Sequence, residues 1–351
     1  MKPKIFLLLF LSLYIVNCTL YITHATTRYV SKTGSSTPPY TSWETAADSI
    51  QKAIDVSWID DTIIVAKGVY YESLYINRTI HLIGSSMDST IIDATNNTEP
   101  NIIYFYNNNS SMKYFYLLNS LPGRIGINTR NSNIKAEFCR TKNLTAALSI
   151  NFSSVHISNF IIRAYNRAIR DECPADTCHS VYMNNIIYGE NVSETPVLFA
   201  FGGKPTFINN IVFESGYCLR GVDLQYISGG VIKNNLVSGY EGVNIRAGQI
   251  VADTVYFENN ISLNSEIGYS TSTAHRTVIR NNIAKDVLKG IQASNGAVAP
   301  DYNLFWNVGE LTGGTASLGN NNIFTDPMFV KAQYQELAEH TIYICRSIHL
   351  Q

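Results

Sequence analysis

The sequence predicts an all-β protein built as a parallel β-solenoid, and two repeated patterns carry that prediction. In the first, a pair of asparagines stands between apolar residues, and its second member falls at Asn185, Asn210, Asn235, Asn260 and Asn282. The spacing is therefore 25, 25, 25 and 22 residues, and fainter copies occur at residues 157 and 301. Repetition at such a period is typical of solenoids, in which each repeat forms one coil stacked on its neighbours.

The second pattern lies about 14 residues before the asparagine pairs. It consists of short segments in which apolar and polar residues alternate, such as RGVDLQY at 220, EGVNIRA at 241, IGYSTST at 267 and KGIQASN at 289. Alternation with a period of two predicts strands with one buried face. A repeating unit of about two or three such strands without a helix predicts one coil of a parallel β-solenoid.

The paired asparagines have a structural explanation. Each coil has to turn sharply, and asparagine adopts the left-handed backbone conformation of such turns more readily than most residues do. Stacked about 4.8 Å apart, the amides can also hydrogen-bond from coil to coil, as they do in cross-β ladders. We therefore interpret these residues as a ladder that stabilises the fold.

The N-terminal segment, residues 26–62, predicts a cap over the open end of the solenoid. The stretch TSWETAADSIQKAID begins with Thr41 and Glu44 at the spacing of a capping box. The helix expected there would have one apolar face, formed by Ala46, Ala47, Ile50, Ala53 and Ile54. A short amphipathic helix of this kind would shield the first coil from solvent.

Composition and the N-terminus narrow the classes of function. The chain has 351 residues, 45% hydrophobic and 15% charged, with a formal net charge of -1. Because no cluster of Lys and Arg stands out, we expect no nucleic-acid binding.

Residues 1–25 combine Lys2 and Lys4 with an apolar run from Ile5 to Val16, which is short for a membrane anchor and predicts a secretory signal peptide. We therefore expect a secreted or cell-surface protein without membrane insertion after cleavage.

The cysteines leave two alternatives open. Six cysteines become five once residues 1–25 are removed. Cys173 and Cys178 could close a small loop as a disulfide in an oxidising compartment, and buried free thiols are an equal alternative. No second Cys or His pair stands at the spacing of a zinc site, so we expect no metal centre.

Both ends of the chain resemble a known superfamily. The stretch from Tyr29 onward, followed by DTIIVAKGVYYESL, contains Gly68, Tyr70 and Glu72, which match the G-x-Y-x-E element of pectinesterase-like proteins. DYNLFWN at 301 and TDPMFV at 325 resemble the closing coil of uncharacterised bacterial secreted and surface proteins. Over about residues 28–330 the chain is thus similar to the pectin-lyase-like superfamily. The resemblance implies a right-handed parallel β-helix and an extracellular polysaccharide as partner.

We expect the parallel β-helix to occupy residues 63–330, with about eleven coils. In the bacterial proteins that the closing coil resembles, a Gly-Ser-Pro segment and a sorting or anchoring module usually follow. Residues 331–351 show neither, so this tail would be divergent or truncated.

The resemblance also implies that polysaccharide would run along a polar face of one stacked sheet. If Val222, Val243, Tyr269 and Ile291 point inward, alternation places two rows of side chains on that face. The first row is Asn128, Ser149, Arg170, Leu198, Asp223, Asn244, Ser270 and Gln292. The second row is Arg130, Asn151, Glu172, Ala200, Gln225, Arg246, Ser272 and Ser294. Such a face is either a glycan-binding groove or an ordinary solvated sheet surface.

As a functional site, this face offers two carboxylates and two arginines. Asp223 and Glu172 are the candidate catalytic acids, and Arg170 and Arg246 would face uronate carboxylates. The candidate substrate-binding residues are Asn244, Gln225, Tyr226 and Gln292.

The catalytic patterns of the superfamily are nevertheless missing. The chain lacks the combination of N-T-D, D-D, G-H-G and R-I-K elements of polygalacturonases and the Q-D-T-L, D-F-I-F-G and L-G-R-P-W elements of pectin methylesterases. A calcium-assisted lyase needs several converging carboxylates, whereas Asp223 and Glu172 would lie two coils, about 10 Å, apart.

The favoured hypothesis is a monomeric extracellular protein that binds polysaccharide without catalysis and without a cofactor. One alternative is a divergent polysaccharide lyase, which would use Ca²⁺, or a pectinesterase-like enzyme on acidic polysaccharide. The other is a structural surface protein or adhesin.

Overall fold

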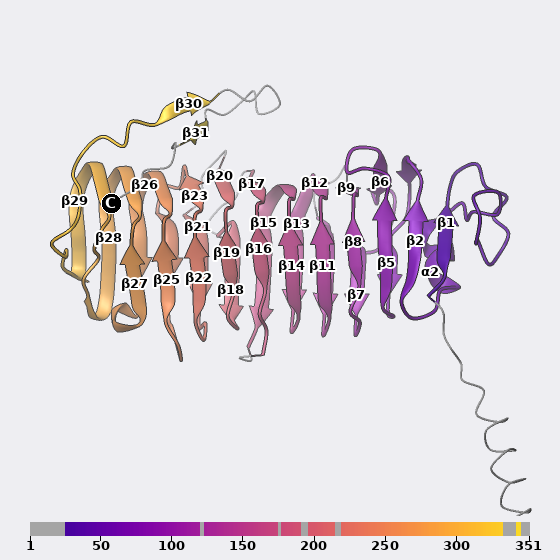
Figure 1. Ribbon diagram of the computed structural model, residues 1–351, viewed down its shortest axis with the longest axis horizontal. Coiled ribbons are helices and arrows are strands. Elements are labelled where there is room, and N and C mark those ends of the chain that lie inside the picture. Colours follow the sequence, from indigo (N-terminus) through magenta and orange to yellow (C-terminus); the bar gives the residue numbers. More distant parts are fainter. Residues whose placement is uncertain are drawn as a thin grey trace, which may run out of the picture.

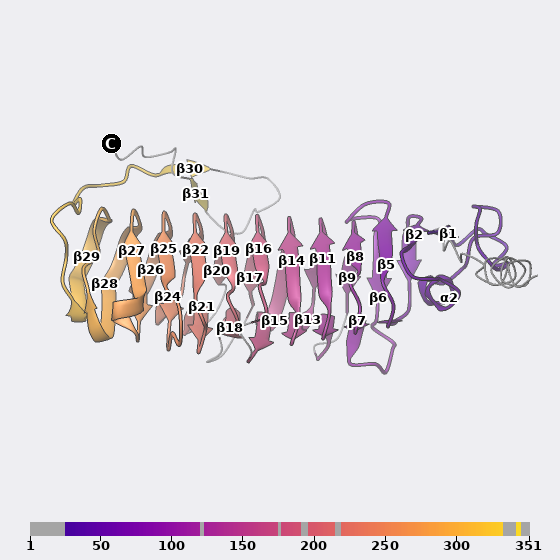
Figure 2. The same ribbon diagram turned by 60° about the horizontal axis from the view of Figure 1, so that its bottom comes forward.

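The computed structural model describes residues 25–119, 123–174, 177–190, 196–214, 219–332 and 342–344. Residues 1–24 of the predicted signal peptide and most of the predicted tail lie outside these residues. The described chain winds into an elongated stack of coils, each offset from the last along one axis (Figures 1 and 2). The prediction of an all-β parallel solenoid is therefore confirmed.

One sheet receives one strand from each coil. All its neighbouring strands are parallel, and its order follows the chain, from β1 beside the N-terminal helix to β27. Its eleven strands are β1 (Thr27–Val30), β2 (Asp61–Val65), β5 (Ile80–Gly84), β8 (Ser111–Lys113), β11 (Asn133–Glu137), β14 (Ser154–Ser158), β16 (Val181–Met183), β19 (Thr206–Ile208), β22 (Gly230–Lys233), β25 (Val255–Glu258) and β27 (Thr277–Arg280).

A second sheet of 18 strands wraps around the other two sides of the stack. The first side, which follows the asparagine corner, contains β3 (Gly68–Tyr70), β6 (Thr90–Asp93), β9 (Tyr116–Leu118), β12 (Arg140–Lys142), β17 (Ile186–Gly189), β20 (Ile211–Glu214) and β23 (Leu236–Ser238). The second contains β4 (Leu74–Ile76), β7 (Asn101–Tyr106), β10 (Ile125–Arg130), β13 (Leu144–Asn151), β18 (Leu198–Gly202), β21 (Arg220–Gln225) and β24 (Val243–Ala247). Four longer strands bend around the corner and belong to both sides: β15 (Ile161–Cys173), β26 (Ile261–Thr271), β28 (Ile283–Val298) and β29 (Leu304–Ala316).

The inside of the stack is one continuous apolar core. Isoleucine, valine, leucine and aromatic side chains from all three sides fill it, and stacked rings such as Tyr182 and Phe207, 4.9 Å apart, join successive coils. Parallel sheets closed around such a core leave only the two ends of the solenoid to be covered.

The asparagine ladder is confirmed, and its two columns have separate tasks. The first asparagine of each pair has a left-handed backbone, with φ of 58° at Asn184 and 57° at Asn209. The second is buried, and Asn185 donates from Nδ2 to Oδ1 of Asn210 over 2.9 Å. The same amide contact continues through Asn235, Asn260, Asn282, Asn303 and Asn322.

The N-terminal cap differs from its prediction. The helix α2 comprises only Ile50–Asp55, so the predicted capping box of Thr41 and Glu44 is wrong. Its N-terminus is capped from a distance: the Glu72 carboxylate accepts hydrogen bonds from the backbone N–H groups of Ile50 and Gln51 at 2.8 and 2.9 Å. A carboxylate there satisfies free donors and complements the helix dipole, which gives the Gly-x-Tyr-x-Glu element a structural task.

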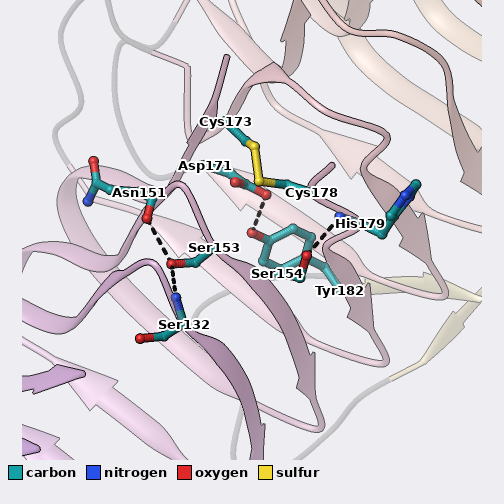
Figure 3. The surroundings of a disulfide bond; sticks show 9 residues. All are labelled: Ser132, Asn151, Ser153, Ser154, Asp171, Cys173, Cys178, His179 and Tyr182. Carbon is teal, nitrogen blue, oxygen red and sulfur yellow. Dashed lines mark hydrogen bonds between the residues drawn. A yellow bond between two sulfur atoms is a disulfide. The ribbon is translucent and has the colours of Figure 1, made fainter. Parts of the chain in front are cut away.

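Cys173 and Cys178 form a disulfide, which decides between the two alternatives that the sequence left open (Figure 3). Beside it, the buried carboxyl of Asp171 accepts a hydrogen bond of 2.8 Å from the Tyr182 hydroxyl. Burial raises the pKa of Asp171 to about 6. Cys139 is a free buried thiol, and no helix among the described residues is long and apolar enough to cross a membrane.

Candidate functional site

The outer surface of β4, β7, β10, β13, β18, β21 and β24 with the second halves of β15, β26 and β28 is called the site face. Strand register defines one outward row along it, which runs perpendicular to the strands. In order, the row consists of Tyr75, Tyr104, Asn128, Ser149, Arg170, Phe199, Asp223, Arg246, Ser270 and Gln292. The predicted first row is thus confirmed at six positions, Asn128, Ser149, Arg170, Asp223, Ser270 and Gln292.

Three residues predicted to point outward point inward instead. Leu198 and Ala200 are 1% exposed and Asn244 is fully buried, so the outward placement of Asn244 as a sugar contact is wrong. Its Nδ2 donates to the Val237 carbonyl at 3.1 Å and to the Ser262 hydroxyl at 2.8 Å.

The cause is a corner at the start of each strand on this face. Two successive residues point inward there, as at Val197 with Leu198 and at Gly221 with Val222. Simple alternation therefore fails for the first residues, although it holds further along. As a result Arg246, and not Asn244, lies opposite Asp223.

Asp223 is the centre of a charged cluster. Its side chain is 1% exposed, and its Oδ2 lies 3.0 Å from Nη1 of Arg220 and 3.7 Å from Nη1 of Arg246. Its Oδ1 accepts a hydrogen bond of 2.6 Å from Nε2 of Gln225. The carboxylate thus orients three side chains that reach the surface around it.

The preceding coils extend this cluster. Arg170 and Glu172 form a bidentate ion pair along one strand, with N to O distances of 2.7 and 2.9 Å. The guanidinium of Arg167 lies 4.8 Å from the ring centroid of Phe199, and burial lowers the pKa of Arg167. Glu172 and Asp223 lie two coils apart, as expected.

Aromatic rings flank the charges. Phe199 and Phe201 occupy the coil between Arg170 and Asp223, and Phe201 packs against Tyr226 with ring centroids 5.2 Å apart. Tyr226 is 50% exposed and has a left-handed backbone with φ of 51°, so its ring projects from the turn after β21.

The four arginines Arg167, Arg170, Arg220 and Arg246, with Glu172, Asp223, Phe199, Phe201 and Tyr226, are called the arginine cluster. Sequence reasoning missed Arg167 and Arg220 because they precede the corner of their strands, and it missed both phenylalanines because Leu198 and Ala200 were placed outward. If two successive inward residues had been assumed at each corner, the alternation would have placed the two arginines and the two phenylalanines on the outer surface.

The pairing of the Glu172 and Asp223 carboxylates limits the catalytic roles that they can take. All four carboxylate oxygens of Glu172 and Asp223 already accept hydrogen bonds or ion pairs from arginine or glutamine. A nucleophile or proton-donor role would therefore displace Arg170 from Glu172, or displace Arg220 or Gln225 from Asp223. The same pairing leaves no converging carboxylates for Ca²⁺, and the described residues hold no group of three or more metal-ligating side chains.

Comparisons with known proteins identify the fold. No family model and no curated protein matches this sequence. The A-module of the mannuronan C-5 epimerase AlgE4 from Azotobacter vinelandii matches with a TM-score of 0.51 and 14% identity, over 79% of this chain and 95% of that chain. Carrot pectin methylesterase (TM-score 0.43, 9% identity, 85% and 88% covered) and pectate lyase Pel9A (0.42, 13%, 89% and 84%) match less well. The chain therefore shares the parallel β-solenoid fold of the epimerase module, and an identity this low shows the fold alone.

Proposed function

We propose that this protein binds acidic polysaccharide along its site face and does not cleave it. The observation that carries the proposal is the convergence of four arginines with only two carboxylates on neighbouring coils, which leaves an excess of two positive charges in the arginine cluster. Formal net charge over the whole chain is -1, so this excess is local.

Guanidinium groups suit such a ligand. They form bidentate, charge-assisted hydrogen bonds with carboxylates, and exposed rings beside them can pack against the apolar faces of sugars. Of the two arginines paired with Asp223, Arg246 is the less tightly held, because its contact is 3.7 Å long against 3.0 Å for Arg220, and its side chain remains 24% exposed. A uronate carboxylate can therefore bind Arg246 while Asp223 keeps its shorter contact with Arg220.

The proposed setting is extracellular. The Cys173–Cys178 disulfide supports an oxidising compartment, and residues 1–25 have the pattern of an export signal. We propose that the mature protein is a monomer with no cofactor. The fold is shared with an epimerase of mannuronan, an acidic polymer, and this motivates the choice of probes. We assign no function to individual residues from that similarity.

Calorimetric titration of residues 26–351 with oligomannuronate and oligogalacturonate tests the proposal. We expect binding that weakens as salt rises, because exposed charges are screened. Arg170→Ala/Arg246→Ala should bind at least about tenfold more weakly, since each charge-assisted hydrogen bond contributes about 1.5–3 kcal/mol.

The matched control removes a charge from another face. Arg280 is on β27, pairs with Glu258, and is 54% exposed, so Arg280→Ala should bind as the unchanged protein does. Equal binding by the Arg170→Ala/Arg246→Ala variant would overturn the proposed site, and equal binding of a neutral cello-oligosaccharide would overturn the acidic ligand class.

Catalysis is tested in the same samples. A lyase would produce absorbance from unsaturated products, a hydrolase would produce new reducing ends, and an esterase would release methanol from methylated pectin. Any of these signals, with or without added Ca²⁺, would replace binding by the enzyme hypothesis if Asp223→Asn removed it. An adhesin without a soluble glycan ligand would bind none of the probes.

A further inference from the structure

Three outward-facing tyrosines, of which Tyr75 is exposed and the other two are half-buried, form a platform at the N-terminal end of the site face. Tyr75 on β4 and Tyr104 on β7 are register partners, and Tyr106 points outward two residues further along β7. Ring centroids lie 5.9 Å apart for Tyr75 and Tyr104 and 6.0 Å apart for Tyr104 and Tyr106. Tyr75 is 47% exposed. These rings lie outside the core, so packing of the fold does not require them.

The platform is aligned with the arginine cluster. Tyr104 belongs to the same outward row as Arg170, with Asn128 and Ser149 between them. Three coil steps separate the two residues, which corresponds to about 14 Å at the usual spacing of strands. A linear ligand that runs along the row would therefore meet both.

The surface between them is polar and ordered. Asn128 donates to Oδ1 of Asn101, and Asn151 donates to Oδ1 of Asn128, both at 3.1 Å. This outward amide chain is separate from the buried ladder. It provides hydrogen-bonding groups for sugar hydroxyls between the tyrosines and the arginines.

We propose that Tyr75, Tyr104 and Tyr106 are a second sugar-binding subsite, which stacks on the uncharged faces of pyranose rings while carboxylates of the same polymer reach the arginine cluster. The inference rests on the proposed function and specifies it further: the ligand is a long acidic polysaccharide that lies along the solenoid axis.

The two subsites act on one ligand because they are held rigidly in line. Once the arginine cluster holds one part of the polymer, the local concentration of sugar at the platform is high, so affinity increases with chain length. Tyrosine suits this position because its ring is apolar and its hydroxyl is polar.

The test compares a trisaccharide with a decasaccharide of oligomannuronate by calorimetry. The trisaccharide is about as long as the span from Arg170 to Arg246, so a trisaccharide bound across both arginines does not reach the platform. We expect Tyr75→Ala/Tyr104→Ala to weaken decasaccharide binding about tenfold and to leave trisaccharide binding unchanged. Tyr75→Phe/Tyr104→Phe, which keeps the rings, should retain most of the affinity for the decasaccharide.

The outcomes separate the two proposals. If the trisaccharide binds through the arginines but the decasaccharide binds no better, or if the Tyr75→Ala/Tyr104→Ala variant keeps full affinity, the platform is overturned alone. If the tyrosine variant loses affinity and Arg170→Ala/Arg246→Ala does not, the platform stands and the arginine site fails. If neither oligosaccharide binds to the unchanged protein, both fail.

Discussion

The corner between the eleven-stranded sheet and the following side is built in two ways along one solenoid. From Asn185 to Asn303, a buried amide occupies the corner in each coil and donates a hydrogen bond to the next amide, and the last of these bonds reaches the half-buried Asn322. In the three preceding coils the same place is taken by Phe115, Cys139 and Phe160, all buried. The residue before it is left-handed in both regions, for example Phe138 with φ of 51°.

The difference shows which feature the corner requires. The left-handed residue sets the direction of the turn, and both regions have it. The buried side chain that follows can be of either kind: apolar and packed in the core, or polar with all of its hydrogen bonds formed. Asparagine adds a direct link between coils, because its amide accepts from one neighbour and donates to the other. The amide region should therefore tolerate substitution less well than the apolar region.

The largest expected effect is the loss of one amide in the middle of the ladder. Asn235 accepts from the backbone N–H and Nδ2 of Asn210 and donates to the Phe207 carbonyl and to Asn260. Asn235→Leu leaves these buried groups without partners and should lower the free energy of unfolding by about 4 kcal/mol. Cys139→Ala, in the apolar region, should cost about 1 kcal/mol. Urea unfolding measures both, and equal losses would contradict the comparison.

Asp171 lies in the coil at the boundary between the two regions. Burial raises its pKa to about 6 from the ordinary value of 3.8, so its ionisation destabilises the folded state. The contribution of the protonated carboxyl to the free energy of unfolding is fully present below pH 3.8. It is lost as the pH rises through about 6. The total loss is up to about 3 kcal/mol, from two pKa units.

Asp171→Asn removes this dependence and keeps an acceptor for the Tyr182 hydroxyl. We expect the variant to be more stable than the unchanged protein at pH 8 and equally stable near pH 4, as measured by urea unfolding across that range. A pH profile identical to that of the unchanged protein would show that other groups govern it.

The disulfide constrains the same boundary coil in another way, within one turn and not between coils. Cys173→Ala/Cys178→Ala should lower the free energy of unfolding by about 2 kcal/mol, because a short loop is no longer closed in the unfolded chain. Thiol reductant should produce the same loss in the unchanged protein and none in the variant. A variant as stable as the unchanged protein would show that the coil is held by its packing alone.

The smallest effect concerns the left-handed residues that both regions share. Asn209→Ala removes the side-chain amide that makes the left-handed conformation accessible to asparagine, and should cost about 1 kcal/mol. Phe138→Asn should be nearly neutral, because it relieves the backbone but loses the stacking of Phe138 on Tyr114, with centroids 5.5 Å apart. A large loss for Phe138→Asn would mean that the ring, and not the backbone, stabilises the apolar corner.

The same contrast explains how far sequence reasoning reached. The repeat was visible from Asn185 onward because a buried amide has few substitutes, whereas Phe115 and Cys139 belong to a position where many apolar residues fit. On the site face, alternation placed Arg170 and Asp223 correctly because these residues lie past the corner. It failed at Leu198 and Asn244 because two successive residues point inward at the corner, and a periodicity of two cannot represent that.

The amino-acid sequence by itself determined the coil length, the parallel solenoid and the place of the asparagine turns, because these depend on local backbone preference and on periodic burial. Only the tertiary structure decided that Arg246 lies beside Asp223 and that Glu72 caps a helix about twenty residues before it. It also decided that Tyr104 shares a row with Arg170. These neighbours come from different coils, and small differences in the length of each turn set which residues meet. Such differences leave the period almost unchanged, so the register across coils is settled by packing.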